Sequence, residues 1–139
     1  MRTEPKQQGG SALFEGLLAI LIFSVGLLSI LMLLSTALVE VGNARYRSEA
    51  SLLAAGLIAE MWTGDRSAAS LQARYADVNA ADYQRWQQQV VAHLPGITAQ
   101  ANQPTVTVDN NRSVTIRLSW QSPGQAQAHS LLATAQITD

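Results

Sequence analysis

The strongest constraint on this chain is an uncharged apolar segment that runs from residue 16 to residue 39. Only four of its side chains are polar, and all four are hydroxyls: Ser24, Ser29, Ser35 and Thr36. A hydroxyl can bond back to a carbonyl of its own helix, and about 20 apolar residues in a helix span a bilayer. The sequence therefore predicts a membrane-spanning helix near the amino terminus.

A cleaved secretory signal peptide is the alternative interpretation of this segment. Such peptides have an apolar region of about 7 to 15 residues, followed by a small-residue cleavage site. Residues 35–37, Ser-Thr-Ala, weakly imitate that site. The apolar run before them is too long, so its length favours a retained helix.

Composition limits what the rest of the chain can do. The roughly 100 residues after the apolar segment have room for one small domain. The chain has no cysteine, which excludes disulfides and thiolate metal sites, and two histidines are too few for most zinc sites. A formal net charge of -1 gives no electrostatic footprint for nucleic acid. We therefore expect no cofactor, no metal and no nucleic-acid partner.

A short polar leader precedes the apolar segment and ends in Gly9-Gly10. Ser11, Ala12, Leu13 and Phe14 then lead to Glu15, the only charge near the start of the apolar run. A carboxylate at the edge of lipid can snorkel to the headgroups at little cost, but an unpaired one farther in is expensive. The position of Glu15 therefore raises the question of which positively charged group pairs with its carboxylate.

Gly10, Ser11 and Glu15, followed by an unbroken apolar helix, resemble the class III signal of type IV prepilins and pseudopilins. The resemblance implies that a prepilin peptidase cuts between Gly10 and Ser11 and N-methylates the new amino terminus at Ser11. Glu15 becomes the fifth residue of the mature chain, with an implied role in assembly and register. Glycine before the cut lets an extended backbone lie close against a protease cleft. Most relatives carry phenylalanine where this chain has Ser11, at a position that tolerates replacement.

The apolar segment narrows the resemblance further. Residues 22–28, Ile-Phe-Ser-Val-Gly-Leu-Leu, are similar to a pattern of the PilV-type minor pilins, and the helix contains no proline. This resemblance implies a minor pilin, a structural and priming component of the type IV pilus. Its implied partners are prepilin peptidase, other minor pilins, the major pilin, the inner-membrane assembly platform and membrane lipid.

The implied organisation has three parts. Residues 1–10 are the leader, residues 11–39 are the half of the helix that crosses the bacterial inner membrane, and residues 40–139 are a periplasmic head that later joins the pilus fibre, at or near its tip. Two alternatives remain open. One is a minor pseudopilin of a type II secretion system, and the other is a membrane-tethered periplasmic binding module.

Beyond the bilayer, the helix should continue as an amphipathic one. Apolar residues recur at spacings of three and four along one face: Ala50, Leu53, Ala54, Leu57, Ile58 and Met61. Gly64 predicts the helix end after Thr63. Residues predicted to face solvent are Arg45, Arg47, Glu49 and Glu60. A continuous helix from Ser11 to Thr63 would be about 80 Å long.

The remaining segments predict a loop, a helix and a sheet. Residues 65–78 read as a loop with some helical turns, and a second helix should run from a cap at Asn79 to Leu94. Three stretches then alternate apolar and polar residues, at 106–108, 114–120 and 131–137, with a turn at 109–112. The predicted fold class is α+β and pilin-like: a long helix packed on about three antiparallel strands, with a second, shorter helix.

An enzyme is the less favoured reading. His93, His129 and Asp82 can be combined with a serine into a triad on paper, but no nucleophile elbow or metal-ligand spacing accompanies them. Histidines at a helix end and a strand start are more typical of surface positions. We therefore expect no catalytic activity.

Overall fold

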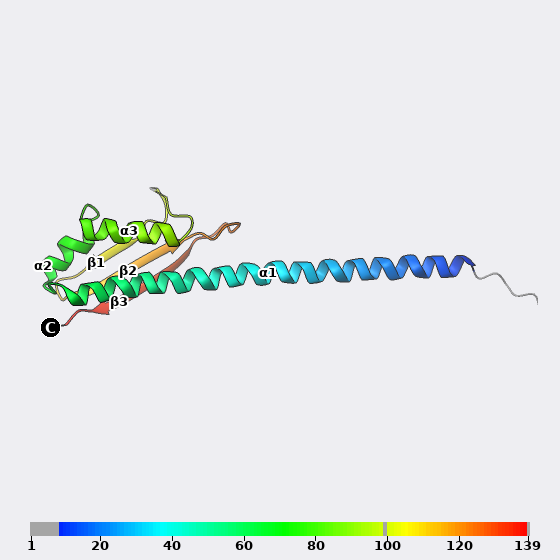
Figure 1. Ribbon diagram of the computed structural model, residues 1–139, viewed down its shortest axis with the longest axis horizontal. Helices are drawn as coiled ribbons and strands as arrows, with labels where there is room; N and C mark the ends of the chain where they lie inside the picture. The colour runs from blue at the N-terminus through cyan, green and yellow to red at the C-terminus, as the bar shows by residue number, and fades with distance from the viewer. Residues whose placement is uncertain (1–8, 99, 139) are drawn as a thin grey trace, which may run out of the picture. The chain divides into compact units, whose positions relative to one another are not determined.

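The computed structural model describes residues 9–98 and 100–138 (Figure 1). The predicted leader lies outside the described residues except for its last two glycines. The chain divides into two compact units, Met1–Val41 and Gly42–Asp139, which we describe separately. One helix, α1 (Gly9–Thr63), contributes residues to both units.

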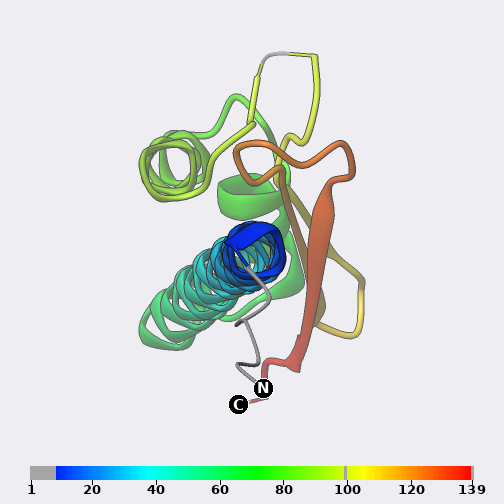
Figure 2. The same cartoon turned by 90° about the vertical axis from the view of Figure 1, so that its right-hand side faces the viewer.

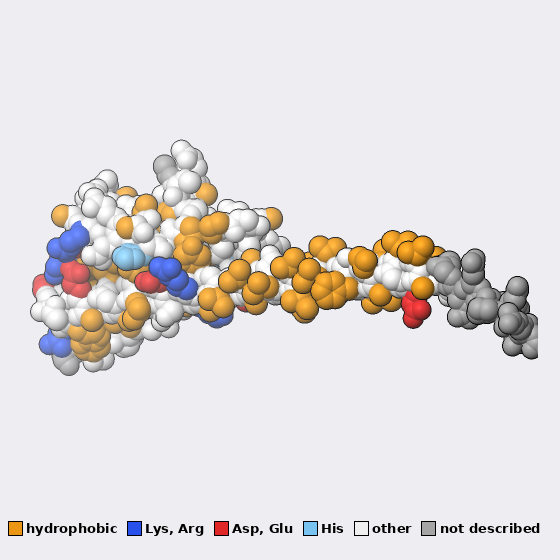
Figure 3. Space-filling model, turned by 45° about the vertical axis from the view of Figure 1, so that its right-hand side comes forward, with side chains coloured by type: hydrophobic (Ala, Val, Ile, Leu, Met, Phe, Trp, Pro, Cys, Tyr) orange, Lys and Arg blue, Asp and Glu red, His pale blue; other side chains and the backbone are white. Residues whose placement is uncertain are grey.

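The first unit consists of the apolar part of α1. Three of its hydroxyls bond to the carbonyl four residues earlier, namely Ser24 to Ile20, Ser29 to Val25 and Thr36 to Met32. Every residue from Ser11 to Val41 is exposed. Figure 3 shows hydrophobic side chains over the visible side of this part of α1. The unit therefore bonds three of its hydroxyls within the helix but does not cover its own apolar surface.

In the second unit, α1 presents a buried apolar stripe. Ala50, Ala54, Leu57 and Met61 are buried, as predicted. The helix ends at Thr63, whose hydroxyl donates to the Glu60 carbonyl at 2.8 Å. Arg45 and Arg47 are exposed as expected, but Glu49 and Glu60 are only half-exposed. The two carboxylates deviate from the prediction because a second helix lies beside α1.

The segment after α1 is more ordered than the predicted loop. It forms α2 (Ala68–Leu71) and a π-helical turn, η1 (Gln72–Ala76). The Ser67 side chain accepts a hydrogen bond from the Ser70 amide and so caps α2. Leu71 and Tyr75 are fully buried, so this segment supplies core residues that the sequence pattern did not identify.

Helix α3 (Ala81–His93) buries Tyr83, Trp86 and Val90 on one face, as predicted. The predicted cap was wrong: the N-cap is Ala80, and Asn79 instead donates its amide to the Asp77 carboxylate at 2.9 Å. Asp77 also accepts the Ala80 amide through its carbonyl at 3.0 Å, so Asp77 organises this turn.

The sheet has three antiparallel strands in the order β1-β2-β3: β1 (Thr105–Val108), β2 (Ser113–Trp120) and β3 (His129–Gln136). The turn between β1 and β2 is held by the Asp109 carboxylate, which accepts the amides of Asn111 and Ser113. The inner face of β2 is buried through Val114, Ile116, Leu118 and Trp120. Figure 2 shows α3 and the head part of α1 on one side of this sheet.

The predicted α+β fold class is confirmed. All buried apolar residues of the described chain lie between Ala50 and Ile137, inside the second unit. That unit, hereafter the head, thus has a complete core of helices on one sheet face. The first unit contributes no residue to this core.

Candidate assembly site

The predicted cleavage residues lie at the very start of α1. Gly10 and Ser11 belong to its first turn, and Ser11 is exposed. The amides of a first helical turn have no intrahelical partner, and glycine is a poor helix former. Opening this turn to the extended form that a protease cleft requires therefore costs little.

Glu15 lies four residues after Ser11 in α1 and is exposed. Residues four apart share one helix face, with a rise of about 6 Å between them. Among the described residues, Glu15 has no ion-pair partner. Near its start, α1 therefore carries the backbone amide of Ser11. One turn later, on the same face, it carries the carboxylate of Glu15, which has no ion-pair partner among the described residues.

The apolar part of α1 carries most of the large hydrophobic side chains that are exposed in the described chain. Its side chains remain widely exposed, with Leu13 and Met32 at 74%. This helix is long and apolar enough to cross a membrane. Each Å² of apolar surface left in water costs about 25 cal/mol, so the segment needs a cover of lipid or of other apolar helices.

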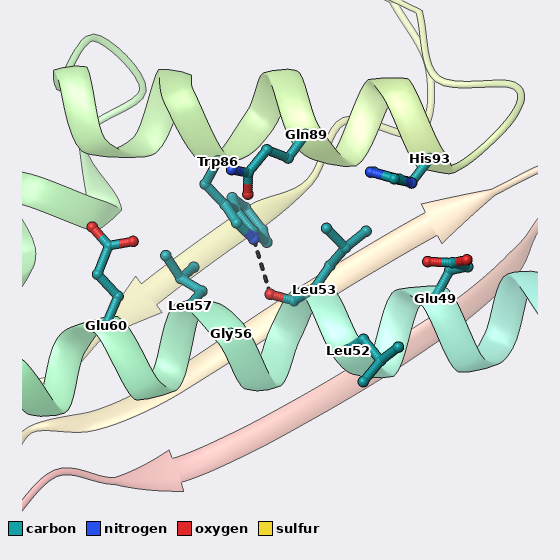
Figure 4. Close-up of a pocket in the computed structure, with 9 residues that line it drawn as sticks. All are labelled: Glu49, Leu52, Leu53, Gly56, Leu57, Glu60, Trp86, Gln89 and His93. Atoms are coloured by element: carbon teal, nitrogen blue, oxygen red, sulfur yellow. Dashed lines mark hydrogen bonds between the residues drawn. The ribbon is translucent and has the colours of Figure 1, made fainter.

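The head has a groove between α1 and α3, with a volume of about 270 Å³ (Figure 4). Its apolar floor includes Leu53, Leu57 and Trp86, and Gly56 leaves open space because nothing lies within 4 Å of where a β-carbon would be. The Trp86 indole donates to the Leu53 carbonyl at 3.1 Å across the groove. Figure 4 shows Glu49 and His93 near one end and Glu60 near the other. Polar groups thus mark both ends of an apolar floor.

A charged network joins three elements at the Glu60 end. Arg74 of η1 bonds the Asp82 carboxylate at 2.6 Å, and Arg85 bonds both Asp82 and Glu60, the latter at 2.9 Å. The hydrogen bond from Arg74 is the main cause that lowers the pKa of Asp82 below its usual range. The network therefore fastens η1 and α3 to the head part of α1.

Two buried tyrosines make further polar contacts in the head. The Tyr83 hydroxyl donates to the Pro104 carbonyl at 2.6 Å, and the Tyr75 hydroxyl donates to the Glu60 carboxylate at 3.4 Å. Burial raises the pKa of both phenols. Both groups serve the packing of the head.

The structure does not bring together the triad considered from the sequence, which combined His93, His129 and Asp82 with a serine. Asp82 is held by two arginines, and His93 is exposed in the last turn of α3. His129 is half-buried, lies 2.5 Å from the Gln125 amide oxygen and stacks on Trp120 with ring centroids 5.9 Å apart. The described residues contain no group of three histidine or acidic side chains that could hold a metal ion.

Sequence reasoning missed the charged network and the groove. The spacing of Asp82 and Arg85, three residues apart on a helix, is a signal that could have indicated one ion pair. The partnership of Arg74 with Asp82 had no such signal, because it depends on the π-helical turn that carries Arg74.

Comparison of the chain with protein-family models, with characterised proteins and with solved structures finds no match. The interpretation of the site therefore depends on its own residues.

Proposed function

We propose that this chain is a minor pilin of a type IV pilus, which is cut by a prepilin peptidase and assembled with other pilins. The observation that carries the proposal is the combination at the start of α1: Gly10 and Ser11 in the first turn, Glu15 four residues later, and an apolar helix that the chain does not cover. A membrane anchor needs only the last of these features. The first two features would add a peptidase cleavage site and a carboxylate that acts in assembly.

The α+β head fits this role. A compact unit with its own core can remain folded while the apolar helix moves from lipid into a bundle of neighbouring helices. In that bundle the apolar surface stays covered, so the transfer costs little hydrophobic free energy. The leader would lie in the cytoplasm and the head in the periplasm, until the subunit joins the fibre at or near its tip.

The role of Glu15 follows from the same transfer. A lone carboxylate in a water-free bundle costs several kcal/mol unless it is paired. Cleavage after Gly10 would create a positively charged amine at Ser11, and N-methylation would keep that amine basic. Glu15 of one subunit and the amine of its neighbour would then set the axial register of the two.

The experiment that tests this function is intact-mass analysis of the chain purified from native membranes. A mature chain that begins at N-methylated Ser11 supports the proposal, whereas a chain that begins at Met1 contradicts it and favours a plain tethered binding module. The variant Gly10→Leu should keep its leader, because a side chain beside the cut would not fit the cleft. Gly9→Leu is the matched control and should still be cut.

A minor pseudopilin of a type II secretion system would share cleavage, helix and head. Deletion of the gene separates the two roles. Loss of surface pili with normal secretion of folded enzymes supports the minor pilin, and the reverse supports the pseudopilin.

A further inference from the structure

The turn between β1 and β2 contains a sequence motif that the proposed function does not use. Residues 111–113, Asn-Arg-Ser, match the pattern of an asparagine, any residue except proline, and then a serine or threonine. In secreted proteins, the asparagine of this pattern is the acceptor of N-linked glycans. The chain contains no second match to the pattern, so the motif points to one residue, Asn111.

The structure places this motif at the surface of the head. Asn111 is exposed in the turn, and Ser113, which follows two residues later, is half-buried at the start of β2. The first buried residue of β2 is Val114. The acceptor position therefore lies before the core begins. A glycan on Asn111 would project into solvent and displace no core residue.

The shape of the turn does not depend on the Asn111 side chain. The amides of Asn111 and Ser113 donate to one carboxylate oxygen of Asp109, at 2.9 and 2.8 Å. Asparagine is favoured in turns partly because it tolerates a positive φ. The residue with a positive φ in this turn is Arg112, at 64°. The backbone of Asn111 thus serves the turn, while its carboxamide has no role in it.

Both side chains of the motif that a glycan transferase reads are also free of contacts. The Asn111 carboxamide and the Ser113 hydroxyl make no hydrogen bond within the described part of the chain. The Gln136 side chain, which lies beside the turn, donates to the backbone carbonyl of Asn111 and leaves its side chain free. Modification of the carboxamide therefore breaks no native hydrogen bond.

We propose that Asn111 is an N-glycosylation site, at which an oligosaccharide is attached to the side-chain nitrogen. The donor is an oligosaccharide that a diphosphate joins to a membrane lipid. This inference rests on the periplasmic head of the proposed function, because the acceptor pattern is used on domains outside the cytoplasm.

The transfer is a substitution at the first sugar of the donor. The carboxamide nitrogen of Asn111 forms a bond to the anomeric carbon, and the bond from that carbon to the diphosphate oxygen breaks. The lipid diphosphate leaves with the bonding electron pair, and the nitrogen gives up one proton to a base of the transferase. Nothing is oxidised or reduced, so the donor and the transferase supply all that the step needs.

The test is peptide mass analysis of the full chain purified from native membranes. A protease that cleaves before aspartate releases residues 109–138 as one peptide, which keeps the motif intact. We expect this peptide to carry the added mass of an oligosaccharide. Fragmentation by electron transfer should locate that mass on Asn111.

Four variants decide whether the modification follows the motif. Asn111→Gln removes the acceptor and Ser113→Ala removes the hydroxyl of the pattern, so each should abolish the added mass. Asn110→Gln changes the exposed neighbour outside the pattern, and Ser113→Thr keeps the pattern, so both controls should remain modified. A melt of each purified variant verifies that it folds, and the two loss variants test the motif independently of each other.

Three results would overturn the proposal: an unmodified 109–138 peptide from the wild-type chain, a saccharide on a serine or threonine of that peptide, or an added mass that survives Ser113→Ala. Failure of the proposed function is recognised separately. In that case the chain begins at Met1, whatever Asn111 carries.

Discussion

The indole Nε1 of Trp86 donates a hydrogen bond to the backbone carbonyl of Leu53 at 3.1 Å, which joins α3 to the head part of α1. The other buried indole, Trp120, differs. Its ring stacks on His129, but its Nε1 has no partner among the described residues. Two tryptophans of one core thus differ in whether their donor is satisfied.

Phenylalanine at each position should measure this difference. Trp86→Phe loses a hydrogen bond as well as ring volume. Trp120→Phe loses similar volume but also removes an unpaired buried donor, whose desolvation costs about 1–3 kcal/mol. We therefore expect Trp120→Phe to lower the free energy of unfolding by about 1–3 kcal/mol less than Trp86→Phe does. Urea denaturation of both variants is the measurement, and an equal or larger loss for Trp120→Phe would contradict the assignment.

The elements with a strong local signal were predictable from the sequence. The stripe of Ala50, Ala54, Leu57 and Met61 has helical spacing, and Gly64 follows the observed helix end. The hairpin also follows its pattern, because Asp109 begins a turn of polar residues between two alternating stretches.

The features that the sequence did not predict depend on local backbone geometry that no residue pattern identifies. Tyr75 reaches the core only because a π-helical turn carries it there, and no residue pattern identifies such a turn. Asn79 is a preferred capping residue, yet the Asp77 carboxylate engages its amide and Ala80 takes the cap. At the candidate assembly site, Gly10, Ser11 and Glu15 were singled out by their resemblance to a prepilin signal, and both the cut and what Glu15 binds stay predictions.

Two glycines with similar positive φ angles should respond differently to alanine. Gly96 has a φ of 75°, and a β-carbon there would lie 2.7 Å from the Gln121 β-carbon and 2.9 Å from its carbonyl oxygen. Gly124 has a φ of 79° but open space around it. Gly124→Ala should cost about 1 kcal/mol of backbone strain, and Gly96→Ala about 3 kcal/mol or more because the backbone must also move. Thermal melts compare the two, and similar melting temperatures would contradict the prediction.

The ion pairs of Asp82 should make the head sensitive to acid. Arg74 lowers the pKa of Asp82 below its ordinary value of 3.8, so the folded state binds this proton less readily than the unfolded state. The stabilisation is complete above that ordinary value and is lost as the pH falls through the lowered pKa. Asp82→Asn should remove this part of the acid dependence and cost about 1–2 kcal/mol at neutral pH.

The measurement is denaturant unfolding of wild type and variant from pH 7 to pH 3. Glu49→Gln is the control for loss of a negative charge, because Glu49 makes no ion pair among the described residues. If Asp82→Asn and wild type lose stability in parallel below pH 4, the network does not contribute as proposed.

A fragment that begins at Val41 should fold without the apolar helix. All buried apolar residues of the described chain lie between Ala50 and Ile137, so the fragment keeps this core and loses the surface that needs lipid. We expect a soluble protein with a cooperative melt and a circular dichroism spectrum with both helix and sheet. A spectrum of helix alone would contradict the arrangement of β1, β2 and β3.

Glu15→Ala should separate membrane insertion from assembly. The helix remains apolar and Gly10 is unchanged, so the variant should insert and be cut like wild type. It should enter pili, or complexes with partner pilins, at least about tenfold less, because the charge-assisted contact with the amine of a neighbouring Ser11 is lost and that amine is left unpaired in an apolar bundle. Glu15→Gln, which keeps the shape without the charge, should assemble almost as poorly. The measurement compares leader processing with co-purification in sheared pili. If the alanine variant assembles as well as wild type, Glu15 merely reaches the lipid headgroups and sets no register.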